Sequence, residues 1–96
     1  MSSGDITRYV VIVKIHEDSL TELNEITNHF SRGGFLLTMA DDEGNIHDLG
    51  INTFGLISTL SADEVKTLAN GLVESATGKE ADIQVNTWEA WQKSEQ

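Results

Sequence analysis

Ser61-Ala62-Asp63-Glu64 is the stretch that decides the fold, because it begins a helix between two strand-like runs. It has the form Ser-x-x-Glu, in which the Ser hydroxyl accepts a helical N–H and the Glu carboxylate accepts the N–H of the Ser. The apolar run Thr53–Leu60 precedes it, and Gly78 predicts where the helix ends. Ser19-Leu20-Thr21-Glu22 repeats the pattern after the apolar run Tyr9–Ile15. The sequence therefore predicts strand–helix–strand twice.

The remaining runs complete the expected order of elements. Phe35–Ala40 is predicted as the second strand, and the polar turn Asp41–Asn45 and the run Ile46–Leu49 continue it as a hairpin. Gly33 predicts the end of the first helix, and Ile83–Thr87 alternates as an edge strand does. Residues at helical spacing form the expected buried faces: Leu20, Leu23, Ile26 and Phe30 in the first helix, and Val65, Leu68, Ala69, Leu72 and Val73 in the second.

This βαββαβ order predicts an α+β fold, the ferredoxin-like sandwich. We expect one antiparallel four-stranded sheet with two helices on one face, and with Tyr9–Ile15 and Thr53–Thr59 as its central strands. Residues 1–96 form a single domain, with an ordered core over about 7–91. Because the first strand is apolar on both faces, we also expect a cover for the other face. Either the C-terminal segment with its two Trp residues or a second copy, in a homodimer, would supply it.

The composition limits the classes of function. The net charge is −10, and the six basic residues are scattered, which argues against tight nonspecific binding of nucleic acid. There is no cysteine, and therefore no disulfide framework or zinc-thiolate site. We see no signal peptide and no apolar stretch long enough to span a bilayer, so we expect a soluble, cytoplasmic protein without membrane association.

The densest polar cluster follows the predicted second strand and comprises Asp41, Asp42, Glu43, His47 and Asp48. Carboxylates and an imidazole in a loop can bind a divalent cation or act as general acid and base. The spacing does not match an EF-hand loop. The alternative interpretation is a hairpin loop that is polar because it is solvated. His16–Asp18 has the same two interpretations, an acid–base or metal role or a simple helix cap.

Trp88 and Trp91 also allow two interpretations. They can stack on bases or contact a partner, or they can cover an otherwise open part of the core. The sequence contains no Cys nucleophile, P-loop, dinucleotide-binding glycine motif or nucleophile elbow, which excludes those classes of enzyme.

Several segments together resemble the GhoS antitoxin family of type V toxin–antitoxin systems. The matching segments are Tyr9–Val11, Ala40–Gly44, Asn52–Phe54, Ser58–Glu64 and Asp82–Thr87. The resemblance runs from Tyr9 to about Trp91. It implies a ferredoxin-like domain and an endoribonuclease that degrades the single-stranded mRNA of a small membrane-acting toxin, GhoT.

The resemblance also implies roles for individual residues. His47 and Asp41 would move protons, and Phe54 would stack on a base from an exposed sheet face. The cations Arg8, Lys14 and Arg32 would contact phosphates. We expect no metal and no cofactor.

The charge favours a different class of function. On the same scaffold, a non-enzymatic acidic protein would bind a basic partner or mimic nucleic acid. In the alignment with the family, Glu25 and Thr27 replace basic residues of the first helix, which also favours this alternative. A small-ligand sensor is a third hypothesis and rests on fold analogy.

Overall fold

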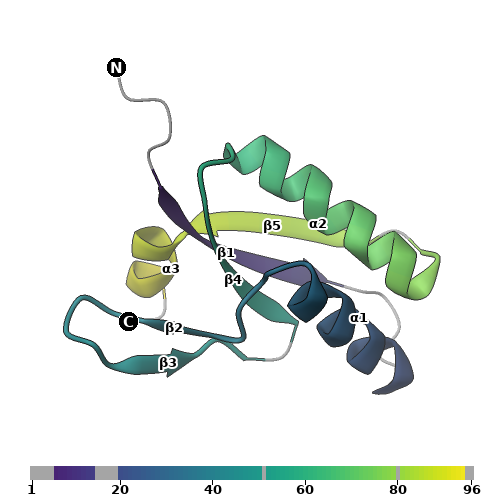
Figure 1. Ribbon diagram of the computed structural model, residues 1–96, viewed down its shortest axis with the longest axis horizontal. Coiled ribbons are helices and arrows are strands. Elements are labelled where there is room, and N and C mark those ends of the chain that lie inside the picture. Colours follow the sequence, from purple (N-terminus) through teal and green to yellow (C-terminus); the bar gives the residue numbers. More distant parts are fainter. Residues whose placement is uncertain (1–5, 15–19, 51, 80, 95–96) are drawn as a thin grey trace.

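The computed structural model describes residues 6–14, 20–50, 52–79 and 81–94. Within them the chain has a mixed α/β architecture with three helices and two sheets. In chain order the elements are β1 (Thr7–Lys14), α1 (Leu20–Arg32), β2 (Thr38–Ala40), β3 (Ile46–Asp48), β4 (Thr53–Ser58), α2 (Ala62–Thr77), β5 (Asp82–Thr87) and α3 (Trp88–Ser94), as Figure 1 shows. None of the helices in the described residues is long and apolar enough to span a membrane.

The main sheet has three strands in the order β4–β1–β5, and β1 is antiparallel to both neighbours. Val11 of β1 lies opposite Phe54 of β4 and Val85 of β5. The central position of β1 and the edge position of β5 agree with the sequence prediction. The prediction of a central place for the third run, Thr53–Thr59, was wrong, because β4 lies at the sheet edge.

The signals at the ends of α2 act as predicted. The N–H of Glu64 donates to Ser61 Oγ at 3.3 Å, and the N–H of Ser61 donates to Glu64 Oε1 at 2.9 Å, which completes the capping box. At the other end Gly78 has φ 72°, and its N–H donates to Glu74 O at 2.8 Å. Helix α1 ends at Arg32, directly before Gly33, also as predicted.

Two expectations at the start of the first helix concern residues that the structure does not describe. Ser19, the cap residue of the first capping box, and the segment His16–Asp18 both lie outside the described ranges.

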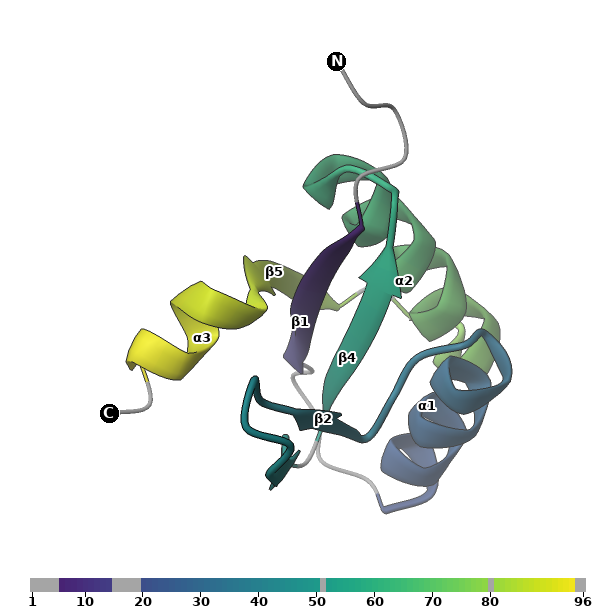
Figure 2. The same ribbon diagram turned by 60° about the vertical axis from the view of Figure 1, so that its left-hand side comes forward.

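Both α1 and α2 pack on one face of the main sheet, as expected (Figure 2). Side chains alternate across a strand, so every second residue of β1 points to the helices. These β1 residues share one core with both helices, β4 and β5, and the buried members of that core are Tyr9, Val11, Val13, Ile26, Phe30, Phe35, Phe54, Leu56, Val65, Ala69, Val73 and Ile83. Leu68, which we placed on the buried face of α2, is 38% exposed.

The opposite face of the sheet is covered by the β2–β3 hairpin and α3 (Figure 2). A second core forms there from Val10, Met39, Leu49 and Trp88, with Ile12 and Trp91 partly buried against it. Trp88 is 1% exposed, which confirms the interpretation that it covers the core. Because the chain itself supplies this cover, the reason we gave for self-association is removed, and the homodimer stays a prediction.

The expected four-stranded sheet is wrong, because the run Phe35–Ala40 does not form one continuous strand. Leu36 exchanges two backbone hydrogen bonds with Gly55 of β4, each 2.7 Å long, but only as an isolated bridge. Phe35 is buried in the helix-side core and Met39 in the core on the other face. A regular strand would place residues four apart on the same face. The chain therefore leaves β4 after Leu36 and pairs as the β2–β3 hairpin over the other face.

Candidate active site

The turn between β2 and β3 holds Asp41 in a defined position. One carboxylate oxygen, Oδ1, accepts the backbone N–H groups of Glu43 and Asn45, both at 2.9 Å. Gly44 occupies the left-handed region with φ 87°, and its N–H donates to Asp41 O at 3.0 Å. Aspartate commonly begins such turns because its side chain bonds the backbone two residues on. The second carboxylate oxygen, Oδ2, accepts a longer hydrogen bond from Asn45 Nδ2, at 3.3 Å, and has one further partner.

That partner is His47 of β3. Its Nε2 lies 2.9 Å from Asp41 Oδ2. The His47 ring also meets the Trp88 ring edge-on, with centroids 5.7 Å apart and an interplanar angle of 63°. The side chain of His47 is 41% exposed and that of Asp41 16%. An oriented imidazole that solvent or a substrate can reach is the arrangement that proton transfer requires.

The charge state of Asp41 determines the tautomer of His47. The hydrogen bond from His47, followed by the N–H of Asn45, lowers the pKa of Asp41 from an ordinary 3.8 to about 2. An ionised carboxylate only accepts hydrogen bonds, so at neutral pH the proton of the shared bond belongs to Nε2. In a neutral imidazole the other nitrogen, Nδ1, is then the acceptor. The pair therefore presents Nδ1 as a base.

Arg8 of β1 joins the hairpin to α3 beside this pair. Its Nη1 lies 3.3 Å from Asp42 Oδ1, and its Nη2 lies 2.9 Å from Glu89 Oε2. The pKa of Glu89 is lowered by its own backbone N–H first and by Arg8 second. Arg8 is the cation that the structure brings to the turn, but its charge is shared with two carboxylates.

The acidic side chains that cluster in the sequence do not gather in one place in the structure, because they have different partners. Asp42 points to Arg8, and Asp48 Oδ1 accepts the N–H of Gly50 at 3.2 Å. Glu43 and Asp42 are exposed, as the solvated-loop interpretation expects. Across the described ranges, no three His, Asp or Glu side chains are grouped in a way that could hold a metal ion.

Phe54 does not lie on an exposed sheet face, so the expected base-stacking position is corrected. It is 1% exposed, and its ring stacks on Phe30 of α1 with centroids 4.4 Å apart and an interplanar angle of 19°. The reason is strand alternation: Phe54 pairs with Val11, and both side chains belong to the helix-side core.

The three cations predicted to bind phosphate are not brought together. Lys14 shares a side-chain face with Arg8 on β1, but the two are six positions apart, about 20 Å along the strand. Arg32 is the last residue of α1, in the helix layer on the opposite side of the sheet. Arg8 alone of the three accompanies His47 and Asp41.

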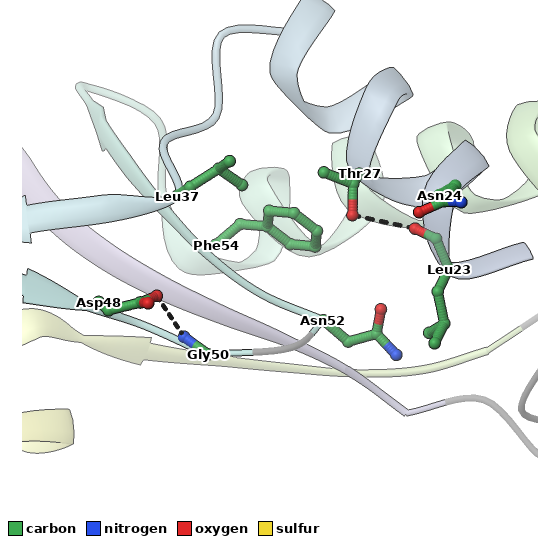
Figure 3. A pocket seen from close by; sticks show the side chains of 8 residues that line it. All are labelled: Leu23, Asn24, Thr27, Leu37, Asp48, Gly50, Asn52 and Phe54. Atoms are coloured by element: carbon green, nitrogen blue, oxygen red, sulfur yellow. Dashed lines mark hydrogen bonds between the residues drawn. The ribbon is translucent and has the colours of Figure 1, made fainter. Parts of the chain in front are cut away.

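Sequence reasoning missed two features. Trp88 and Glu89 contact His47 and Arg8, respectively, although more than forty positions separate each pair of partners. A pocket also lies between α1 and the segment before β4 (Figure 3). Its residue Asn52 has φ 56°, a left-handed conformation that Asn tolerates better than most residues. No local pattern predicts a pocket whose walls come from separate elements.

Comparison with known proteins identifies relatives of the whole chain. A family model described as "Endoribonuclease GhoS" matches residues 1–94. Two curated proteins of Escherichia coli, from strains K12 and O157:H7, are each 62% identical over 91 residues. The match covers 95% of this chain and 95% of each relative, and both are named "Uncharacterized protein YdiZ". No solved structure gives a significant match. The chain belongs to the GhoS endoribonuclease family.

Proposed function

We propose that this protein is an antitoxin-like endoribonuclease that cleaves the single-stranded mRNA of a small, GhoT-like membrane toxin. Family membership over residues 1–94 supports the ribonuclease class. The observation that carries the assignment to a site is the 2.9 Å hydrogen bond between His47 Nε2 and Asp41 Oδ2. It orients an accessible base beside Arg8, the one predicted phosphate ligand that lies at this turn.

The proposed reaction uses the 2′-hydroxyl of the RNA as the nucleophile. Nδ1 of His47 takes the hydroxyl proton while the 2′ oxygen forms a bond to the adjacent phosphorus. The bond from phosphorus to the 5′ oxygen breaks, and that oxygen takes a proton from the imidazolium or from water. The products are a 2′,3′-cyclic phosphate and a 5′-hydroxyl. Asp41 orients His47 and stabilises the imidazolium that forms, and Arg8 faces the phosphate.

The test is cleavage of a toxin transcript by the intact protein, with and without a divalent ion. His47→Ala should reduce the cleavage rate by about 10²–10⁴-fold, the usual contribution of a general base. Asp41→Asn should also reduce it, because the amide keeps an acceptor for the turn but places an N–H group where the carboxylate accepted the Nε2 proton of His47. His29→Ala is the matched control, since His29 lies on α1 and bonds to Glu25 O.

Two outcomes would contradict the proposal at different levels. Cleavage by the double variant His47→Ala/Asp41→Asn at the wild-type rate would refute the site. If the wild-type protein cleaved no transcript under either metal condition, the ribonuclease function would be refuted.

A second candidate function is a non-enzymatic binding protein for a basic partner. The observation that favours it is the pairing of Arg8 with Asp42 and Glu89, which offsets its charge for an incoming phosphate. Net charge −10 favours it as well. Affinity for RNA that falls steeply with salt would support phosphate contacts and the ribonuclease. If RNA does not bind at low salt, the binding-protein function is favoured.

A further inference from the structure

A pocket lies on the other side of the β2–β3 hairpin from His47. The pocket measures about 390 Å³, within the range of about 300–1,000 Å³ typical of small-molecule sites. Asp48 lines it, whereas the neighbouring His47 turns toward Trp88, because adjacent strand residues point to opposite faces. The pocket is therefore distinct from the His47–Asp41 pair but shares β3 with it.

The walls of the pocket combine apolar surface with a few polar groups (Figure 3). Leu23, Leu37 and Phe54 supply the apolar part, and Asn24, Asp48 and Asn52 supply amides and a carboxylate. Among the described residues that line the pocket there is no Lys or Arg, and Asp48 would repel a phosphate. The lining thus suits a neutral, flat group that carries hydrogen-bond donors.

Asn52 supplies the specific observation. Its backbone carbonyl accepts the N–H of Val13 at 2.8 Å, and the residue adopts its left-handed conformation directly before β4. The side-chain oxygen Oδ1 is buried and has no hydrogen-bond partner in the described part of the chain. A buried acceptor without a donor is unfavourable. An N–H group of a ligand that reached Oδ1 would remove this cost.

We infer that the pocket binds one nucleobase of the RNA, an assignment that rests on the proposed function. A nucleobase has flat faces that apolar walls can cover and an edge that carries donors beside acceptors. The carboxamide of Asn52 offers the matching acceptor and donor side by side. Because β3 carries both Asp48 and His47, the base held in the pocket helps select which phosphodiester reaches His47.

The experiment is an NMR titration of the ¹⁵N-labelled full chain with uridine and with adenosine, which carry no phosphate. Binding should shift the amide signals of Asn24, Asn52 and Phe54 and leave those of α3 unchanged. Asn52→Gly removes the amide and allows the left-handed backbone, so the fold is kept. It should weaken the nucleoside Kd by about fivefold, the value of one hydrogen bond to a buried group. Asn70→Ala on α2 is the matched control and should bind as the wild type does.

The outcomes separate this inference from the proposed function. If neither nucleoside shifts the pocket signals at millimolar concentration, or if Asn52→Gly binds as the wild type does, the pocket assignment is overturned, whatever the cleavage assay gives. Conversely, pocket binding that Asn52→Gly weakens supports the assignment even if the wild type cleaves no transcript. In that case only the proposed function is refuted.

Discussion

At the scale of single residues, one hydrogen bond and one turn determine how His47 and Asp41 can act. Backbone N–H groups of the turn donate to one carboxylate oxygen of Asp41, and His47 and the side chain of Asn45 contact the other. Both residues were candidates from the sequence, because carboxylates and an imidazole cluster there. Their separation of six positions did not by itself show that they meet. The hairpin pairing brings them together.

We predict a pH effect at Asp41. Its pKa in the folded protein is about 2, below the ordinary 3.8, so the unfolded chain binds the proton more readily. Asp41 therefore stabilises the fold fully above about pH 4, and this stabilisation is lost as the pH falls toward 2. A carboxyl ¹³C NMR titration should place the Asp41 midpoint near 2.

His47→Ala supplies the comparison for that titration. It removes the largest cause of the shift, so the Asp41 midpoint should rise toward 3.8 but stay below it, because the N–H groups of Asn45 and Glu43 remain. His29→Ala should leave the midpoint unchanged. A wild-type midpoint at the ordinary value would contradict the His47–Asp41 hydrogen bond.

At the scale of elements, α2 shows how local signals determine the ends of a helix but not its interior. Its capping box and its Gly78 terminus follow from residues four or fewer positions apart. Gly71 lies exposed in the helix interior, and apart from its chain neighbours and the backbone of its own helix a Cβ at this position would meet no atom within 4 Å. Glycine in a helix interior is less favourable than alanine because it loses more backbone freedom on folding.

Gly71→Ala should therefore stabilise the protein by about 1 kcal/mol. Thermal unfolding followed by circular dichroism should show a rise in Tm of about 4–8 °C. Gly78→Ala is the matched control. It should lower the Tm, because φ 72° is strained for alanine. A fall in Tm for Gly71→Ala would mean that this part of α2 packs against something the structure does not show.

At the scale of the whole molecule, a three-stranded sheet separates two cores. Gly55 determines how closely the core that contains Met39 packs against β4. A Cβ at Gly55 would lie 2.6 Å from Met39 Sδ and 2.7 Å from Met39 Cγ. Met39 is 3% exposed and has little room to move. The absence of a side chain at this one position thus lets the β2–β3 hairpin lie directly on β4.

Gly55→Ala should destabilise the fold by about 1–3 kcal/mol, the usual cost of overpacking. A double-mutant cycle tests whether this cost comes from Met39. Urea unfolding gives the free energy of unfolding of the wild type, of Gly55→Ala, of Met39→Ala and of the double variant. In the Met39→Ala background the added methyl group should cost less, because its two closest contacts are gone and only Leu49 Cδ1, at 3.3 Å, remains close. Equal costs in both backgrounds would show that the hairpin does not rest on Gly55.

Local and pairwise patterns in the sequence determined most of this architecture. Helix ends, strand alternation and the two-sided apolar character of β1 depend on neighbouring residues, so α1, α2, β1 and β5 were predictable, as was the cover supplied by Trp88. The candidate pair His47 and Asp41 followed from composition and family resemblance.

Only the tertiary structure decided where the run after α1 goes and which residues share a site. Phe35 and Met39 are both apolar, and nothing local assigns them to different cores. Burial of Met39 against Gly55 and Trp88 places the chain over the face of β4 and not beside its edge. Phe54 enters the helix-side core because it packs there against Phe30. Such contacts join residues far apart in the chain, so their energies follow from three-dimensional packing and not from sequence spacing.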